Sequence, residues 1–371
     1  MRPSTAVARA LLCAVPGLVG IVAHAESPDQ RSWDPKAAAA YLDSRAAWWM
    51  AWPSAARDHG TFCVSCHTAL PYVLARPALR AALREPERTY AEARLLDNVV
   101  KRVTLWKDVE PFYPDQLRGI PKTSESRATE AILNALILAS RDAEQGRLSD
   151  ETRTALGNMW ALQMRTQELS GAWAWLNFGL DPWESATAPY FGAALAVLAT
   201  GTAPGGYAAT PEIQPNIKLL QEYFRREDAR QPLFNRLVAL WVSARAPGLI
   251  GFDTQSVIDA ALGKQQQDGG WSTASLGDWK RKDGSELDKN SDAYATGLVT
   301  LAFQQSALRS AAPQVARGLE WLRRNQDRAT GQWPASSLNK QRDPLSDAGR
   351  FMSDAATAFA VLSLTHAPAA R

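Results

Sequence analysis

The stretch Phe-Cys-Val-Ser-Cys-His-Thr at residues 62–68 contains the only two cysteines that lie close together in the chain. Two residues separate Cys63 from Cys66, and His67 follows directly. This Cys-x-x-Cys-His spacing is typical of covalent haem attachment, because two thiols can form thioethers to the two vinyl groups of one porphyrin. The histidine on the same turn then lies beneath the iron as its proximal ligand. The motif predicts one covalently bound haem c.

The two thiols could instead form a disulfide, bind zinc or act as a thioredoxin-like pair. A disulfide across two intervening residues would close a very small loop and stabilise little, and it remains the alternative to haem. A structural zinc site needs four nitrogen or sulfur ligands, whereas the chain offers no second cysteine pair and the other histidines, such as His59 and His366, are scattered. The alternating β/α pattern expected around a thioredoxin-like pair is missing.

The sequence leaves the sixth ligand of the iron open. Methionine would raise the potential, histidine would lower it, and an open position would allow small molecules to bind. Met50 and His59 are the candidates closest to the motif, and Met159, Met164 and Met352 lie further along the chain. For any one methionine, packing in the core is the simpler role.

The first residues of the chain resemble a secretory signal peptide. Two arginines are followed by an apolar run at residues 10–22, and Ala23-His24-Ala25 has the small-x-small pattern that signal peptidase recognises. We therefore expect a signal peptide at residues 1–25 and an exported, periplasmic protein, with a retained anchor as the alternative. Cleavage would leave the two motif cysteines as the only ones in the chain, in a compartment that permits disulfides.

Charge and hydropathy restrict the partners. The net charge of +3 is small and no run of lysine and arginine stands out, so nucleic acid is not expected. After residue 25 no stretch of 18 uncharged apolar residues occurs, so no transmembrane segment is expected after removal of the signal peptide.

Downstream of the motif, the sequence repeats itself. Three turns share the form Gln-x(3,4)-Gly-x-Trp, at residues 167–173, 265–271 and 326–333. Amphipathic helical patterns precede these turns at residues 151–166, 254–267 and 312–326, and a similar one lies at 213–227. Markedly apolar helical patterns lie at residues 126–140, 185–200, 232–244, 291–306 and 353–367. We expect the glutamine to bond loop backbone, the glycine to permit the reversal and the tryptophan to cover the helix end, all as structural roles.

Alternating amphipathic and apolar helices predict an all-α fold in which outer and inner helices close into a two-layered (α/α) toroid. We expect the toroid at residues 111–371 and a helical haem-binding segment at residues 26–110 packed on it. Further helical patterns lie at residues 35–50 and 87–106. A helix is expected to start near Cys63 and to be broken into short pieces by Pro71 and Pro77.

The three turns resemble the QW repeats of squalene-hopene cyclases and related terpenoid cyclases. The closest match is formed by Arg317-Gly318, Trp321-Leu322, Gln326 and Gly331-Gln332-Trp333. The resemblance covers residues 126–367 and implies an (α/α) toroid with a central cavity. It does not extend to catalysis, because the Asp-x-Asp-Asp motif with which squalene-hopene cyclases protonate their substrate is missing. Fold alone does not settle function.

Three carboxylates near the starts of apolar helices are candidates for acids that face such a cavity. Asp292 and Asp354 begin two of these helices, and Glu184 precedes a third. A carboxyl group in an apolar cavity would have a raised pKa and could donate a proton. Helix N-capping is the simpler alternative.

Together these features predict a periplasmic c-type cytochrome that transfers electrons on a cyclase-like scaffold. Its partner would be a redox protein or a small-molecule electron donor or acceptor. Three alternatives stay open: haem-dependent oxidation of an apolar, isoprenoid-like molecule in the toroid cavity, a terpenoid cyclase-type enzyme, and a non-catalytic lipid-binding protein.

Overall fold

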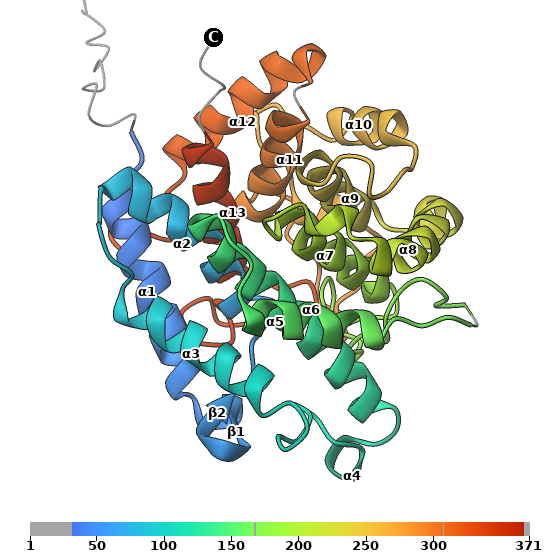
Figure 1. Cartoon of the computed structure of the whole chain (residues 1–371). Helices are drawn as coiled ribbons and strands as arrows, with labels where there is room; N and C mark the ends of the chain where they lie inside the picture. Colours follow the sequence, from blue (N-terminus) through green and yellow to red (C-terminus); the bar gives the residue numbers. More distant parts are fainter. Residues whose placement is uncertain (1–31, 167, 307, 367–371) are drawn as a thin grey trace, which may run out of the picture. The chain divides into compact units, whose positions relative to one another are not determined.

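The structure is a computed structural model, and it describes residues 32–166, 168–306 and 308–366. These residues are mostly helical, which confirms the prediction of an all-α fold (Figure 1). The described residues from Trp33 onward form one compact unit. The predicted signal peptide, residues 1–25, lies outside the described residues. None of the described helices combines the length and the apolar character needed to cross a membrane.

Six helices contact one another in a closed series and are called the inner helices below. They are α2 (Ala69–Leu83), α5 (Lys122–Gln145), α7 (Ala188–Thr202), α9 (Leu233–Arg245), α11 (Ala293–Gln305) and α13 (Phe351–Thr365). Each packs on the next in this order, and α13 packs on α2, which closes the series. Figure 1 shows that α2, near the start of the chain, lies beside α13 at its end.

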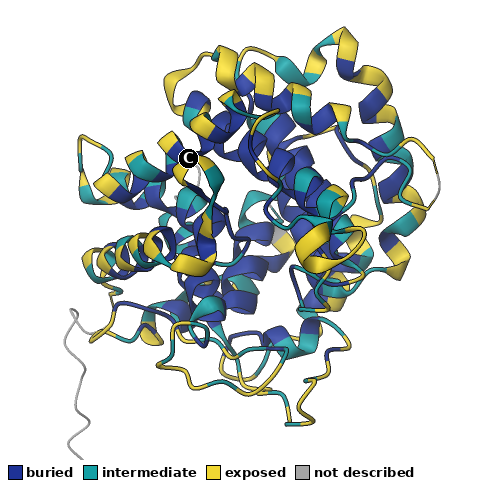
Figure 2. Cartoon of the chain, turned by 90° about the horizontal axis from the view of Figure 1, so that it is seen from below, coloured by how far each residue is buried: buried dark blue, intermediate teal, exposed yellow. Residues whose placement is uncertain are grey.

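Six further helices pack outside this series and are called the outer helices. They are α1 (Pro35–Ala51), α3 (Tyr90–Thr104), α6 (Asp150–Ala161), α8 (Gln214–Glu227), α10 (Thr254–Leu262) and α12 (Ala312–Arg324). Each contacts at least one inner helix. Exposed residues lie along their outward sides, whereas the inner helices are mainly buried (Figure 2). This division follows the distinction between amphipathic and apolar patterns in the sequence.

The remaining elements are short. One helical turn, α4, covers Asp115–Arg118, and the strands β1 (Ala56–Arg57) and β2 (Thr61–Phe62) pair as an antiparallel hairpin directly before the cysteine motif. Short 3-10 helices are η2 (Pro53–Ala55), η3 (Asp58–Gly60), η4 (Tyr207–Ala209), η5 (Pro211–Ile213), η6 (Asp228–Arg230), η7 (Thr273–Leu276) and η8 (Arg309–Ala311).

Hydrogen bonds hold each of the three Gln/Trp turns against the end of the outer helix that precedes it. The indole N–H groups of Trp173, Trp271 and Trp333 donate to carbonyls near the ends of α6, α10 and α12. The side chains of Gln163, Gln265 and Gln326 donate to the carbonyls of Gly171, Gly269 and Gly331. The structural role predicted for Gln265, Gln326 and the three tryptophans is therefore confirmed. In the first turn the bonding glutamine is Gln163, whereas the predicted Gln167 lies outside the described residues.

The prediction for the helix at the cysteine motif was wrong. The motif lies in a loop, and α2 begins only at Ala69, with Thr68 at its N-cap position. The hydroxyl of Ser65 accepts the N–H groups of Thr68 and Ala69, so it competes with helical bonding in the residues before α2. Neither proline breaks α2. Pro71 lies in the first turn, where the N–H has no intrahelical partner in any case, and Pro77 costs one hydrogen bond within a well-packed helix.

Candidate functional site

The loop that carries Cys63, Cys66 and His67 is held at its first cysteine. The N–H of Cys63 donates to the carbonyl of Ala55 at 2.9 Å. The indole N–H of Trp49, from α1, donates to the Cys63 carbonyl at 2.8 Å. Because both polar groups of its backbone are bonded, Cys63 has a fixed position relative to α1.

Helix α3 holds the strand before the motif. Asn98 accepts the N–H of Phe62 at 2.8 Å and donates to its carbonyl at 3.0 Å. The fully buried Arg102 donates to the hydroxyl of Thr61 at 2.7 Å and forms an ion pair with the buried Glu130 of α5. A buried ion pair contributes little net stability but is costly to break, so it fixes the arrangement of these elements.

The side chains of both cysteines and of His67 line one cavity of about 290 Å³, called the motif cavity below. Its walls are mainly aromatic and apolar, and they come from both ends of the chain. They include Trp49, Trp52, Phe112, Trp183, Phe351 and Met352.

The imidazole of His67 is held by two rings and one hydrogen bond. Phe351 of α13 stacks on it with 3.9 Å between ring centroids, and Trp49 presents an edge at 5.0 Å. Nδ1 lies 2.9 Å from the hydroxyl of Thr68. Nε2 has no hydrogen-bond partner among the described residues, so it is the nitrogen left for a ligand in the cavity.

His67 is neutral at ordinary pH. Burial, with the positive charges of Arg45 and Arg342 nearby, lowers the pKa of His67 to about 3. A neutral imidazole has a lone pair on one ring nitrogen, and this is the form that binds a metal.

Cys63 and Cys66 are buried, and they are not joined by a disulfide. Burial raises the pKa of Cys63 to about 11, an effect that the Arg57 charge partly offsets, and burial raises the pKa of Cys66 well above its usual range. Both thiols are therefore protonated at neutral pH. This does not favour a redox pair that depends on a reactive thiolate.

Asp354 lies behind His67 and lines neither large cavity. It accepts hydrogen bonds from the Tyr41 hydroxyl (2.8 Å), Arg45 Nε (2.8 Å) and the Thr68 hydroxyl (2.6 Å). Burial raises the pKa of Asp354, and the hydrogen bond from Arg45 partly offsets this. The N-capping alternative is wrong for Asp354, because Arg350 occupies the N-cap position of α13 and Asp354 lies in the first turn.

Asp292 does cap its helix, which confirms the simpler alternative there. Its carboxylate accepts the N–H groups of Tyr294 (2.9 Å) and Ala295 (3.0 Å) in α11. It also accepts the N–H (2.6 Å) and hydroxyl (2.7 Å) of Thr273. Although burial raises the pKa of Asp292, these four donors occupy the acceptor sites of the carboxylate, so little capacity remains for acid chemistry.

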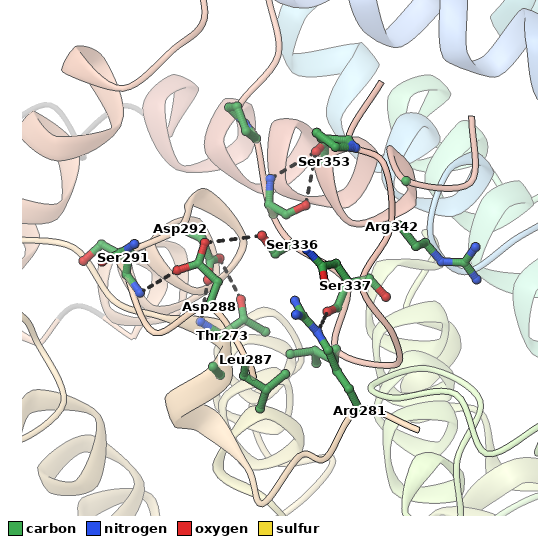
Figure 3. Close-up of a pocket in the computed structure, with 18 of the residues that line it drawn as sticks. Thr273, Arg281, Leu287, Asp288, Ser291, Asp292, Ser336, Ser337, Arg342 and Ser353 are labelled. Carbon is green, nitrogen blue, oxygen red and sulfur yellow. Dashed lines mark hydrogen bonds between the residues drawn. The ribbon is translucent and has the colours of Figure 1, made fainter. Parts of the chain in front are cut away.

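Asp292 belongs to the wall of a second, larger cavity of about 780 Å³. Figure 3 shows its polar lining, including Asp288, Arg281 and several serines. Ser337 and Arg342 line both cavities, so the two adjoin. In Figure 3 the guanidinium of Arg342 points away from Asp288 and Asp292.

The two sixth-ligand candidates closest to the motif do not line the motif cavity. Met50 is buried in α1, and His59 lies in the β1–β2 hairpin with its side chain 46% exposed. Met352, in the first turn of α13, does line the cavity. Met159 is buried in α6, and Met164 lies in the first Gln/Trp turn.

Glu184, one of the three carboxylates expected to face a cavity, lines the motif cavity, and its place beside the cysteines was not predicted. Its charge contributes to the raised pKa of both Cys63 and Cys66, and burial raises the pKa of Glu184 itself to about 7. Thr68 and Phe351 were not among the predicted site residues. Thr68 directly follows the motif, which is a local signal, whereas Phe351 comes from a distant part of the chain.

The described side chains fit the donor set that a haem c requires. Two protonated thiols and a neutral imidazole with an unpartnered nitrogen line one cavity with aromatic walls. No group of three or more His, Cys, Asp or Glu among the described residues is arranged to hold a metal ion by itself. A haem iron needs only one or two protein ligands, because the porphyrin supplies the other four.

Comparisons with known proteins add little to this geometry. No protein-family model matches the chain, and no curated protein matches it either. A solved structure of a polysaccharide lyase is similar over 90% of this chain and 89% of its own, with 12% sequence identity and a TM-score of 0.38. The class that fold and site define is an all-α protein with a buried Cys-x-x-Cys-His motif.

Proposed function

We propose that this protein is an exported c-type cytochrome that carries one covalent haem. Cys63 and Cys66 would hold the porphyrin through thioethers, and His67 would bind the iron through Nε2. The observation that carries this proposal is that all three side chains line the same aromatic cavity. The bound group would supply reversible one-electron chemistry, with a redox protein or a small molecule as the partner.

The scaffold is proposed to be an (α/α) toroid. The closed series of contacts from α2 through α5, α7, α9, α11 and α13 back to α2 supports this, as does the packing of the outer helices on it. In this arrangement the haem-binding segment supplies α2 and completes the inner ring. The proposed domain limits, residues 26–110 and 111–371, then divide the sequence of one packed unit.

Oxidation of a bound molecule is the second candidate function. It is favoured by the larger cavity, which adjoins the motif cavity at Ser337 and Arg342. The polar lining suits a molecule with hydroxyl or charged groups better than an isoprenoid. Cyclase-type chemistry is not favoured, because Asp292 is engaged as a helix cap.

The first experiment tests haem attachment. The full chain would be exported in a host competent for cytochrome c maturation and assayed by pyridine haemochrome and by haem staining of a denaturing gel. We expect one haem per chain, loss of covalent haem in a Cys63→Ser/Cys66→Ser variant, and retention in the control His59→Ala. Absence of covalent haem from the unchanged protein would refute the proposal.

The second experiment separates electron transfer from oxidation. A six-coordinate, low-spin spectrum that does not respond to carbon monoxide or peroxide is expected for simple electron transfer. A Met352→Leu variant tests whether this methionine supplies the sixth ligand, with Met50→Leu as the control. A spectrum that responds to both small molecules in the unchanged protein would favour the oxidation function.

A further inference from the structure

A continuous chain of hydrogen bonds leads from the motif histidine to a buried ion pair. His67 Nδ1 lies 2.9 Å from the Thr68 hydroxyl, and this hydroxyl lies 2.6 Å from Oδ2 of Asp354. The other oxygen of Asp354, Oδ1, accepts from Arg45 Nε and from the Tyr41 hydroxyl, both at 2.8 Å. The chain joins the motif loop to α1 and to α13.

The direction of each hydrogen bond follows from the donors available. Arg45 is always cationic, its side chain is 4% exposed, and Asp354 is 1% exposed. A carboxylate between a guanidinium and two hydroxyls can only accept, so the single hydroxyl proton of Thr68 points to Asp354. The Thr68 oxygen is then left as an acceptor, and His67 must supply the proton from Nδ1.

We infer that Thr68 and Asp354 are positioning residues that hold His67 in the tautomer protonated on Nδ1, leave Nε2 free for the iron, and lower the potential of the haem. The last two parts rest on the proposed function. A partner on the far nitrogen fixes the tautomer and ring orientation of a metal-binding histidine and makes it a stronger donor. A stronger donor favours the oxidised iron and so lowers the potential.

The packing around His67 supports a positioning role. Phe351 stacks on the ring from α13, the same helix that carries Asp354, and Trp49 meets it from α1, the helix that carries Arg45. The same two helices thus set both the plane of the ring and the direction of its Nδ1–H.

The tautomer can be tested without haem. The full chain, produced in a host without the haem-attachment machinery, would be studied by nitrogen-15 NMR of its histidine rings. We expect His67 to be protonated on Nδ1 in the unchanged protein and in Thr68→Ser, and to lose this preference in Thr68→Val. Protonation on Nε2 in the unchanged protein, or an unaltered tautomer in Thr68→Val, would overturn the inference.

The potential is tested on the haem-loaded protein. Thr68→Val should shift the midpoint potential upward, and Thr68→Ser should restore it, since serine keeps the hydroxyl. Asp354→Asn should shift the potential in the same direction, but it leaves Arg45 without its buried partner, so Thr68→Val is the safer variant. Equal potentials in the valine, serine and unchanged proteins would contradict the inference.

The two proposals can fail separately. A chain that accepts no haem but shows the Nδ1–H tautomer lost in Thr68→Val would refute the cytochrome and retain the positioning role. A chain that accepts haem, but whose potential and His67 tautomer are unaffected by Thr68→Val, would retain the cytochrome proposal and refute the positioning role.

Discussion

A carboxylic acid lies beside the two motif cysteines, at a position where burial controls its charge. Burial raises the pKa of Glu184 from 4.5 to about 7, and the positive charge of Lys122 partly offsets this effect. The group is therefore close to half ionised at neutral pH. Its charge influences both thiols of the motif, so the electrostatics of the motif cavity should change with pH.

This burial predicts a pH-dependent penalty on folding. Below about pH 4.5 Glu184 is neutral in both folded and unfolded chains and costs nothing. As the pH rises to about 7 the unfolded chain ionises first, so the folded state loses stability relative to Glu184→Gln, by up to about 3 kcal/mol above pH 7.

The measurement is urea unfolding at pH 5 and pH 8 for the unchanged protein, Glu184→Gln and the control Glu212→Gln, with all three in the same state of haem loading. Glu212 is exposed in η5. A difference between the unchanged protein and Glu184→Gln that does not grow with pH would contradict the prediction.

Asp292 provides a second test at this scale, because a cap and an acid respond differently to amide replacement. Asparagine can still accept the cap bonds through its one oxygen, but its NH2 group cannot accept the Thr273 N–H, so Asp292→Asn should lose less free energy of unfolding than Asp292→Ala. Asp292→Ala should lose about 1–2 kcal/mol. Chemical denaturation of both variants measures this, and equal losses would contradict the capping role.

At the scale of elements, the helices were predictable and the loop contacts were not. Predicted inner patterns such as residues 291–306 and outer patterns such as 312–326 match α11 and α12 closely, because the period of apolar residues survives in any tertiary context. The start of α2 was missed because the Ser65 hydroxyl accepts the N–H groups of Thr68 and Ala69 and so competes with helical bonding before Ala69. That competition is local but leaves no periodic signal.

The contacts of the site depend on residues far apart in the sequence. Asp354 was predicted from its place at a helix start, but its partners Tyr41 and Arg45 come from α1. No pattern within α13 specifies them. The motif itself was recognisable because its residues are adjacent in the sequence.

Gly331, in the third Gln/Trp turn, shows how tightly α1 packs on the repeats. Its φ is +79°, and a Cβ built there would overlap the backbone of Ala37. Gly146, which ends α5, has a similar φ of +68° with no atom within 4 Å of such a Cβ. Replacing either glycine would therefore strain the backbone in the same way, but only at position 331 would the new Cβ also collide with a neighbour.

We expect Gly146→Ala to lose about 1 kcal/mol for its left-handed backbone. Gly331→Ala should lose about 1–3 kcal/mol more because α1 must move. Thermal and urea unfolding of the two variants gives the comparison. Equal losses would show that α1 does not pack closely against this turn in solution.

At the scale of the molecule, the motif segment and the repeats should unfold together. Gln326 of the third turn accepts the N–H of Asp34 at 2.6 Å and donates to its carbonyl at 3.0 Å, which fixes the start of α1. Helix α2 packs between α13 and α5. Because the described buried apolar residues of the motif segment belong to the same core cluster as those of the repeats, one cooperative transition is expected.

Gln326→Ala tests this coupling, because it removes both part-buried bonds to Asp34 and the buried bond to the Gly331 carbonyl. The loss should be about 1–3 kcal/mol, and a probe at the motif, such as hydrogen exchange of α2, should shift by the same amount as the helical circular dichroism. Gln265→Ala is the control, since the amide of this residue likewise donates to the carbonyl of its turn glycine, Gly269, and to a carbonyl of the next outer helix, that of Gln314 in α12. It should destabilise the chain similarly, again with both probes shifting together. A motif segment that opens at lower denaturant than the repeats, in the unchanged protein or in Gln326→Ala alone, would show that the motif cavity lies between two independently stable parts.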